Sequence, residues 1–312
     1  MNFDLVIIGS GPGGYVAAIR GSQLGLNVAI VEREALGGIC LNWGCIPTKS
    51  FLRSAEVLKI IESSEKYGIK SELGEVDIRE VVKRSRSIAK KLSSGVEHLL
   101  KKNKVKIFAG EASFKSSTSI KIKSKSNLIQ EISSKNICIA SGGRPRQISG
   151  ISNSSDVWFY KDALQVDMIP KKLLVVGSGA IGVEFASFFA QMGSDVSLLE
   201  SQPNILPNED LDVSNFVERQ FLNRGIKIYK NHSLLSLKEK RGLFEAELKT
   251  EDKTLSLGFE KAILAVGIVG NIEDLNLEVV NIKCSKGSIL VNEYCKTNID
   301  NIYAIGDVAN PP

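Results

Sequence analysis

The sequence predicts an α/β fold that contains the same strand–helix–strand unit twice. The first copy opens with four apolar residues at 5–8, and a glycine-rich turn follows them directly. The second copy opens with a similar run at 173–176 and continues into a turn of the same kind. Residues 105–140 hold short alternating segments broken by polar turns, which predicts an antiparallel β-meander, and further strands up to about residue 266 complete the second unit.

The two glycine-rich turns share the pattern G-x-G-x-x-G and stand in the same register. Gly177 follows Gly9 by 168 residues (177 − 9), and Glu200 follows Glu32 by the same 168 (200 − 32). One such fingerprint is a weak signal. Two fingerprints in register, each with a strand, a helix, a second strand and a terminal acid, indicate two Rossmann-type units that each bind a dinucleotide.

Each position of the fingerprint has a physical role. The first glycine makes the tight turn, the second lets the backbone approach a pyrophosphate at the helix N-terminus, and the last lets the helix pack on the sheet. An ordinary turn or packing role is the alternative for each glycine, and the shared register disfavours it. The candidate cofactor-binding residues are Gly9, Gly11, Pro12, Gly13, Gly14, Glu32 and Arg33 in the first unit and Gly177, Gly179, Ile181, Gly182 and Glu200 in the second.

The acid at the end of the second unit's strand predicts which dinucleotide binds there. A carboxylate accepts hydrogen bonds from the free ribose hydroxyls of NAD and repels the ribose phosphate of NADP, which usually meets an arginine. Residues 201–203, which follow Glu200, supply no arginine. We therefore expect the second unit to prefer NAD(H).

The other elements follow in order along the chain. Residues 47–66 and 77–102 are expected to be helices, the second with a continuous apolar stripe that belongs to the core. Residues 28–31 and 196–199 are expected to be strands that each end in an acid. A further helix is predicted at about 211–224, and residues 153–156 are an expected linker between domains.

Two cysteines follow the first fingerprint closely. Cys40 and Cys45 are five residues apart, which in an ideal helix separates their Cα atoms by roughly 8–9 Å, whereas a disulfide needs about 4.4–6.8 Å. A bridged pair therefore excludes regular helix throughout, and Gly44 and Asn42 permit an irregular turn. Pro47 suits the first turn of a helix that begins near Cys45, where unpaired N–H groups stabilise a thiolate. From the spacing alone, two buried cysteines that never pair are an equal alternative.

The bulk composition limits the class of protein. A chain of 312 residues with 43% hydrophobic and 24% charged residues predicts two globular domains. The net charge of +5 is mild, and the basic clusters at 90–91 and 101–104 are best explained as a solvated helix face, without a nucleic-acid motif. We expect no nucleic-acid partner.

The sequence also predicts where the protein works. It shows no signal peptide and no apolar stretch of membrane-spanning length, which predicts a cytoplasmic protein without a membrane anchor. Cysteine pairs in that compartment are usually catalytic or metal-binding. Among the five cysteines no second pair completes a zinc site, so no metal is expected, and Cys138 in its apolar run is predicted to be a core residue.

Two Rossmann units with Cys-x4-Cys directly after the first resemble the flavoprotein disulfide reductases. The segment 37–47, Gly-Gly-Ile-Cys-Leu-Asn-Trp-Gly-Cys-Ile-Pro, is similar to the redox signature of that family throughout, and the resemblance covers the whole chain. Segments 41–44 and 46–49, together with Glu200, are similar to its dihydrolipoamide dehydrogenase branch, which serves 2-oxoacid dehydrogenase complexes.

The resemblance implies cofactors and domain limits. FAD belongs to the first unit and NAD to the second, with a discontinuous FAD domain at 1–149 plus 273–312 and an NAD domain at 150–272, each of the three-layer ββα type. Cys40 and Cys45 form the redox disulfide. Lys49 lies near the flavin and pairs with Glu184, Gly110 contacts the FAD adenosine and Asp307 holds the ribityl chain. The further cofactor-binding positions are Gly38, Ser141, Gly142 and Gly267.

The resemblance also implies a reaction and partners. A dihydrolipoyl group on a lipoyl domain of a 2-oxoacid dehydrogenase or glycine cleavage complex reduces the disulfide, and the electrons leave through FAD to NAD⁺. Family members are homodimers through a C-terminal interface domain that supplies a histidine–glutamate pair. This chain stops at residue 312, and His98 and His232 do not match that base, so we expect a partial enzyme. Loss of the positioned base should cost about 10²–10⁴ in rate, and loss of the substrate cleft should cost more.

Three alternatives stay open. One is another flavoprotein disulfide reductase, although the small thioredoxin reductases carry their cysteines in the NAD domain. A second is an NADH diaphorase or oxidase that passes electrons from the flavin to dyes or oxygen. A third is a fragment that binds cofactors without catalysis.

Overall fold

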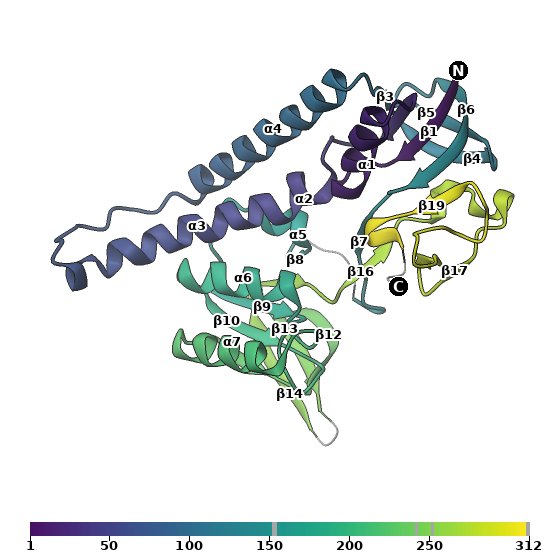
Figure 1. The fold of residues 1–312 in the computed structure, drawn as a ribbon. Coiled ribbons are helices and arrows are strands. Elements are labelled where there is room, and N and C mark those ends of the chain that lie inside the picture. Colours follow the sequence, from purple (N-terminus) through teal and green to yellow (C-terminus); the bar gives the residue numbers. More distant parts are fainter. Residues whose placement is uncertain (152–154, 241–242, 251–252, 310–312) are drawn as a thin grey trace. The chain divides into compact units, whose positions relative to one another are not determined.

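The computed structural model describes residues 1–151, 155–240, 243–250 and 253–309 (Figure 1). The chain divides into two compact units. The first holds residues 1–46, 87–144 and the segment from 268 onward, and the second holds 47–86 and 145–267. The predicted domains differ from these units mainly in placing 47–86 with the first, and they stay a prediction. Part of the expected linker at 153–156 lies outside the described residues.

A parallel sheet forms the centre of the first unit. Its strands lie in the order β3-β2-β1-β6, and β19 adds in parallel to the far side of β6. The predicted strand at 28–31 is observed with Glu32 as its last residue. The strands are β1 (Asn2–Ile8), β2 (Val28–Glu32), β3 (Lys106–Ala109), β6 (Ile129–Ile139) and β19 (Ile302–Ala304).

The β-meander predicted at 105–140 is present in the first unit. Strands β4 (Glu111–Ser116) and β5 (Ser119–Lys123) run antiparallel to each other, and β5 pairs with the first half of β6. The second half of β6 pairs in parallel with β1. The long strand β6 therefore connects the meander to the parallel sheet.

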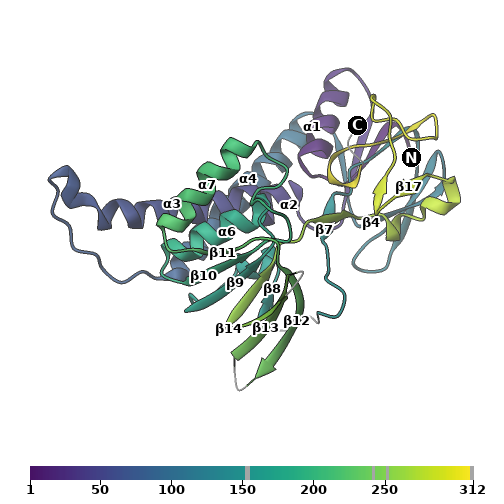
Figure 2. The ribbon, with the colours of Figure 1, turned by 90° about the horizontal axis from the view of Figure 1, so that it is seen from below.

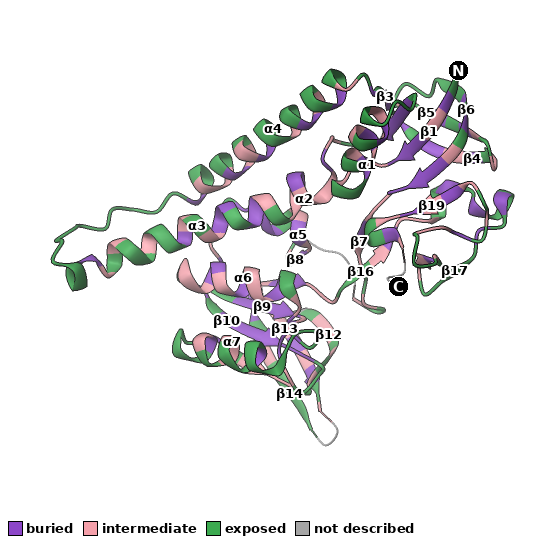
Figure 3. Ribbon diagram, viewed as in Figure 1, coloured by how far each residue is buried: buried purple, intermediate pink, exposed green. Residues whose placement is uncertain are grey.

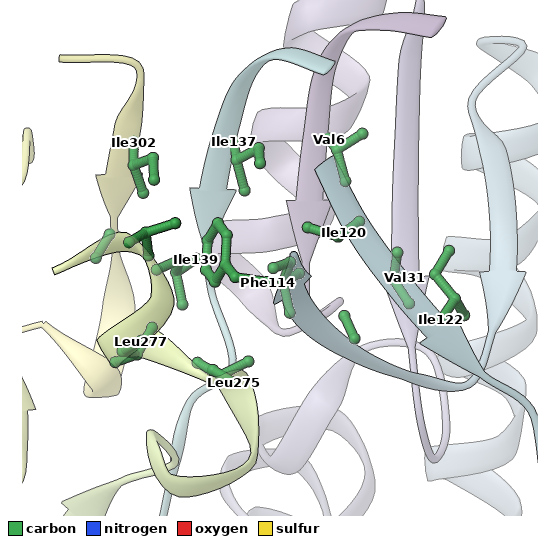
Figure 4. Close-up of a cluster of buried hydrophobic side chains, with 14 of the residues drawn as sticks. Val6, Val31, Phe114, Ile120, Ile122, Ile137, Ile139, Leu275, Leu277 and Ile302 are labelled. Carbon is green, nitrogen blue, oxygen red and sulfur yellow. The ribbon is translucent and has the colours of Figure 1, made fainter. Parts of the chain in front are cut away.

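Alternating side chains of the parallel sheet divide the first unit into three layers. Val6 packs with Phe114 and Ile120 of the meander (Figure 4), in a buried cluster that also contains Ile8. Ile7 points to the opposite face, where α1 (Pro12–Gln23) and the second half of α4 (Ile78–Lys102) cover it. Because every second residue enters a different core, β1 and β2 are buried along most of their length (Figure 3).

The second unit repeats this plan. Its parallel strands lie in the order β11-β10-β9-β15-β8, and β12, β13 and β14 form an antiparallel meander (Figure 2). Leu174 and Val176 of β9 pack with Ala246 and Leu248 of the meander. The strands are β8 (Val157–Trp158), β9 (Lys172–Val176), β10 (Asp195–Leu199), β11 (Lys227–Tyr229), β12 (Ser233–Lys240), β13 (Leu243–Lys249), β14 (Thr254–Phe259) and β15 (Lys261–Leu264).

The remaining elements are mostly short. The predicted helices are observed as α3 (Cys45–Glu62) followed by η1 (Ser64–Tyr67), as α4 and as α7 (Leu211–Asn223). Within the described residues, every helix is too short or too polar to cross a membrane. The others are α2 (Gly38–Trp43), α5 (Tyr160–Ala163), α6 (Ala180–Gln191), β7 (Gly143–Pro145), β16 (Ile268–Gly270), η2 (Glu273–Leu275), η3 (Leu277–Val280), β17 (Cys284–Ser285), β18 (Ser288–Ile289) and η4 (Gly306–Val308).

Phe188 of α6 is expected to be a main stabilising residue of the second unit. It is fully buried, and its ring centroid lies 4.7 Å from that of Phe51 and 5.1 Å from that of Phe189. Phe188→Ala should lower the free energy of unfolding by about 3–5 kcal/mol, measured by urea denaturation. Phe216→Ala is the matched control, because Phe216 is 56% exposed on α7 and its loss should change the value by less than about 0.5 kcal/mol. Equal midpoints for the two variants would contradict this assignment.

Candidate active site

The glycine-rich turn of the first unit is shaped by two close approaches of backbone to backbone. Gly9 has a φ of +101°, and a Cβ there would lie 2.2 Å from the carbonyl oxygen of Ala140. A Cβ on Gly14 would lie 2.1 Å from the carbonyl oxygen of Gly9. Gly11 caps α1, with open space in the direction that a Cβ would take, and Pro12 is the first residue of the helix. The N-terminus of α1 is therefore held against the strand end with its backbone accessible.

The second unit has the same turn with the same stereochemistry. Gly177 has a φ of +95°, and a Cβ there would lie 2.4 Å from the Ala265 carbonyl oxygen. A Cβ on Gly182 would lie only 1.9 Å from the carbonyl oxygen of Gly177. Gly179 caps α6 in open space, and Ile181 in the first turn of α6 is 36% exposed. Both loops thus present an accessible helix N-terminus, which fits a pyrophosphate.

The two predicted acids make matching hydrogen bonds. Oε2 of Glu32 accepts from the N–H of Ser10 at 2.9 Å and from its hydroxyl at 2.6 Å. Oε2 of Glu200 accepts from the N–H of Ser178 at 2.9 Å and from its hydroxyl at 2.6 Å. In each unit the carboxylate therefore lies beside the glycine-rich turn, at the edge where an adenosine ribose is expected.

The Glu200 carboxylate is buried and ionised. Burial by itself would raise its pKa, but hydrogen bonds from the Ser178 hydroxyl, from the N–H groups of Gln202 and Ser178, and from the Ser201 hydroxyl outweigh it and lower the pKa below its usual value. A buried negative charge attracts ribose hydroxyls and repels a phosphate, and the second unit therefore fits NAD better than NADP.

Two further predicted residues lie next to Glu32. The N–H of Gly110 donates to the Glu32 carbonyl oxygen at 2.9 Å, which places Gly110 directly after β3 and beside the end of β2. Arg33 follows Glu32 and is exposed. The structure thus gathers Gly110, Arg33 and Glu32 at one edge of the first sheet.

The redox segment packs directly on the first glycine-rich turn. The N–H of Gly37 donates to the Ser10 carbonyl oxygen at 3.0 Å. A Cβ on Gly38, the first residue of α2, would lie 2.6 Å from Cα of Gly11. Position 38 therefore has room only for glycine, because it packs on the same loop that is expected to hold a pyrophosphate.

The cysteines lie on either side of a break between two helices. Cys40 belongs to α2, which ends at Trp43, and α3 begins at Cys45. A Cβ on the intervening Gly44 would lie 3.4 Å from Cα of Cys40 and 3.2 Å from the Ile39 carbonyl oxygen. Regular helix is therefore interrupted between the two cysteines, as a pair within disulfide reach requires.

Asn42 does not contribute to that break, contrary to expectation. It lies inside α2, where its side-chain amide donates to the carbonyl oxygens of Leu36 at 3.0 Å and Gly38 at 2.9 Å. Asn42 therefore fixes the start of α2, and Gly44 alone makes the turn.

Cys45 is exposed at the first position of α3, an 18-residue helix, while Cys40 is half-buried. Cys138 differs, because burial raises the pKa of its thiol to about 12 and the nearby Cys295 adds to the shift, which agrees with the predicted core position. The pairing of Cys40 with Cys45 stays a prediction.

Lys49 and Glu184 form the predicted ion pair. Nζ of Lys49 lies 2.5 Å from Oε1 of Glu184, and both residues belong to the second unit. Their side chains are 61% and 26% exposed. An exposed pair of this kind contributes at most about 1 kcal/mol to stability, so its position invites a functional explanation.

The other predicted residues lie at the ends of strands. Ser141 follows β6, and its hydroxyl donates to the Asn271 carbonyl oxygen at 2.8 Å, while Gly142 next to it faces open space. Asp307 is exposed in η4, directly after β19. In the second unit, Gly267 accepts a hydrogen bond from the Arg146 N–H at 3.0 Å.

The histidines do not join these groups. His98 is exposed on α4. Nδ1 of His232 lies 2.6 Å from the Lys230 carbonyl oxygen, and its ring packs against Tyr229. In the part of the chain that the structure describes, three or more His, Cys, Asp or Glu side chains do not gather in an arrangement that could hold a metal ion.

Sequence reasoning missed Ser10 and Ser178. Each is the middle residue of a G-x-G turn, and each donates two hydrogen bonds to the acid of its unit. The signal was available, because Ser178 follows Ser10 by 168 residues (178 − 10), the same offset as the glycines.

Comparisons with known proteins place the chain in a family. The family model described as pyridine nucleotide-disulphide oxidoreductase matches residues 3–312, and this chain belongs to that family. It is 45% identical over 313 residues to the dihydrolipoyl dehydrogenase of Zymomonas mobilis subsp. mobilis, covering 100% of this chain and 67% of that protein. It is 45% identical over 329 residues to the dihydrolipoyl dehydrogenase of Rhizobium etli, covering 100% of this chain and 68% of that protein.

A solved structure supports the same fold. The Cu(II) complex of the HOCl-induced flavoprotein disulfide reductase RclA from Escherichia coli matches with a TM-score of 0.85 and 26% sequence identity, over 99% of this chain and 66% of that one. The chain thus spans about two thirds of the length of the relatives that it matches.

The family confirms several predictions. The chain is a flavoprotein oxidoreductase of the dihydrolipoyl dehydrogenase type, with two Rossmann-like domains and with FAD and NAD as its cofactors. The roles of the individual residues rest on the geometry above and stay predictions.

The two glycines at the start of α6 should respond differently to a methyl group. Gly182→Ala should destabilise the second unit by about 1–3 kcal/mol or more, because its Cβ would overlap the Gly177 carbonyl oxygen. Gly179→Ala has open space and should keep the stability, yet lose NAD⁺ affinity by about tenfold, because the methyl lies where a pyrophosphate approaches. Denaturation and NAD⁺ titration of both variants measure this. A destabilised Gly179→Ala variant would show that the turn is tighter than described.

Alkylation of the reduced chain should separate the cysteines. At pH 8 a thiol with a pKa of about 12 is roughly 10⁻⁴ ionised, so Cys138 should resist iodoacetamide and gain reactivity only as the pH rises toward 12. The exposed Cys45 should be modified first, as peptide mass spectrometry would show. In guanidinium both should react, and equal rates in the native chain would contradict the buried position of Cys138.

Proposed function

We propose that this chain is the cofactor-binding core of a dihydrolipoyl dehydrogenase, in which Cys40 and Cys45 oxidise the dithiol of a protein-bound dihydrolipoyl group. The observation that carries the proposal is the contact between Gly38 and Gly11, where an added Cβ would come within 2.6 Å of the neighbouring Cα. The helix that bears Cys40 thus begins on the loop that faces a dinucleotide. Thiol chemistry and a redox cofactor are thereby brought together in one unit.

The residues present fit the two cofactors. In the first unit FAD would be held by the N-terminus of α1 at its pyrophosphate, by Glu32 at its adenosine ribose and by Asp307 at its ribityl chain, with Gly110, Arg33, Ser141 and Gly142 nearby. In the second unit NAD would be held by the N-terminus of α6 and by Glu200, with Ile181 and Gly267 as further contacts. When bound, FAD accepts two electrons from the dithiol and transfers them as hydride to NAD⁺.

The cysteines carry out the exchange with the substrate. A thiolate of the dihydrolipoyl group attacks the Cys40 sulfur of the disulfide, the sulfur–sulfur bond breaks, and Cys45 leaves as a thiolate. The second substrate sulfur then attacks the mixed disulfide, which releases the cyclic lipoyl disulfide and leaves both cysteines reduced. The helix N-terminus at Cys45 favours its departure, because unpaired N–H groups stabilise the negative charge.

Lys49 is proposed to act through its charge. Its ion pair with Glu184 keeps the ammonium group in one position, although 61% of the Lys49 side chain is exposed. As the resemblance to the family implies, this positive charge would stabilise negative charge on the reduced flavin. Because a two-electron potential changes by about 30 mV for each 1.4 kcal/mol, a modest stabilisation can set the direction of electron flow.

The partners follow from the proposed substrate. Lipoyl domains of a 2-oxoacid dehydrogenase complex, or of the glycine cleavage system, would bring the dihydrolipoyl group, and the full-length enzyme would be a homodimer. The names of the relatives support this context. We also propose a cytoplasmic location, where reducing conditions suit a catalytic cysteine pair.

Reduction of another disulfide is the second candidate. The match to RclA, a flavoprotein disulfide reductase, favours it over a diaphorase or a non-catalytic fragment. The same fold and cysteine pair serve both reactions, which differ in the substrate: a dihydrolipoyl dithiol that is oxidised in the first, and another disulfide that is reduced in the second.

Cys40→Ser should separate thiol chemistry from flavin chemistry. In the flavin-loaded chain without oxygen, NADH should still bleach the flavin, whereas dihydrolipoamide should not, because the sulfur that it attacks is gone. Absorbance spectra before and after each reductant measure this. Cys138→Ser is the control, since that buried thiol lies outside the exchange and both reductants should still work. A colourless chain, or a Cys40→Ser variant that dihydrolipoamide reduces at the original rate, would overturn the proposal.

A further inference from the structure

Each glycine-rich turn contains a buried serine that bonds to the acid of its own unit. Ser10 and Ser178 are both 0% exposed. Each lies between the first and second glycine of its turn and donates from its N–H and its hydroxyl to a single carboxylate oxygen, 22 positions further along. The two copies agree within 0.1 Å in both distances, at 2.9 and 2.6 Å. The same hydrogen-bond geometry in two separate loops indicates that the two serines have the same role.

The second carboxylate oxygen is held from the opposite side. Oε1 of Glu32 accepts from the N–H of Glu34 at 2.8 Å, and Oε1 of Glu200 accepts from the N–H of Gln202 at 2.9 Å. The terminal torsion of a glutamate is otherwise broad. Donors on both oxygens therefore fix the plane of each carboxylate before any ligand arrives.

The serine hydroxyl is the part of this arrangement that depends on the side chain. The backbone N–H groups stay in place whatever residue occupies the position, whereas an alanine would remove the 2.6 Å bond to each Oε2. A hydrogen bond to an ionised group is among the stronger ones, and its loss in a buried place leaves the acceptor short of a donor.

We infer that Ser178 and Ser10 are positioning residues that fix the carboxylates of Glu200 and Glu32 for the ribose hydroxyls of NAD and FAD. The inference rests on the proposed function for the assignment of one dinucleotide to each unit. Preorganisation of this kind raises affinity, because the binding step no longer has to order the acid. It also raises selectivity, since a carboxylate that cannot turn away keeps repelling a ribose phosphate.

Binding measurements on single variants test the inference without turnover. Ser178→Ala should weaken NAD⁺ binding to the flavin-loaded chain by about tenfold in titration calorimetry and should leave flavin retention unchanged. It should also narrow the ratio of the NADP⁺ and NAD⁺ dissociation constants. Ser10→Ala should do the reverse, with a greater loss of FAD during gel filtration and an unchanged NAD⁺ affinity in chain reloaded with FAD.

Ser201→Ala is the matched control. Its hydroxyl also contacts Glu200, at 3.2 Å, but Ser201 is exposed and adjacent to the acid in sequence. It therefore adds little constraint, and NAD⁺ affinity should change by at most about twofold.

A double-mutant cycle shows whether Ser178 acts through Glu200. In a Glu200→Ala background, Ser178→Ala should cause no further loss of NAD⁺ affinity, because the group that it positions is absent. A serine that merely supported the turn would lower affinity in both backgrounds to the same degree.

The outcomes separate this inference from the proposed function. If the unaltered chain binds neither FAD nor NAD⁺, the proposed function fails. The positioning role of the serines is wrong if the chain binds both cofactors but Ser178→Ala lowers NAD⁺ affinity no more than Ser201→Ala does. It is also wrong if the loss of NAD⁺ affinity in Ser178→Ala adds fully to the loss in Glu200→Ala.

Discussion

The contact that the site depends on is the approach of a helix N-terminus to the carbonyl oxygen of the preceding strand end. In both units this approach leaves no room for a Cβ. A Cβ on Gly14 would lie 2.1 Å from the Gly9 carbonyl oxygen, and one on Gly182 would lie 1.9 Å from the Gly177 carbonyl oxygen. This approach places the N-terminus of α1 shortly after β1 and that of α6 shortly after β9, and the first N–H groups of each helix have no carbonyl partner within the helix. The buried serine that donates to the acid lies in the same turn, between the first and second glycine.

Burial makes the hydrogen bonds from Ser178 necessary for the Glu200 carboxylate to remain ionised. A carboxylate that is 7% exposed, such as Glu200, would be unfavourable as an ion without donors on both oxygens. Ser178 and Gln202 supply those donors, and the acid stays charged while it faces the loop. The Glu200 carboxylate is therefore stabilised as an ion by the protein, and it can still accept hydrogen bonds from ribose hydroxyls.

The sequence predicted the elements whose pattern is local. Strand β2 ending at Glu32, helix α4 and the meander of the first unit follow from apolar periodicity and turn residues, and the register of 168 located both loops. It did not predict contacts that depend on the fold. Asn42 was expected to permit a turn, but its side-chain amide donates to the carbonyl oxygens of Leu36, before α2, and Gly38, within it. The hydrogen bond from the Ser10 hydroxyl to Glu32 joins residues 22 positions apart. Side-chain partners far apart in sequence are decided by tertiary packing.

The two copies differ in what they attach to the same scaffold. In each unit the segment after the acid folds back and donates to the carbonyl oxygen of the buried serine, from Gly37 to Ser10 and from Leu206 to Ser178, both at 3.0 Å. In the first unit this returning segment continues into α2 and the cysteines, packed on Gly11. In the second it continues toward α7, and Gly179 stays open. The same fold-back contact therefore leads into different segments, and only in the first unit does it place a cysteine-bearing helix on the glycine-rich turn.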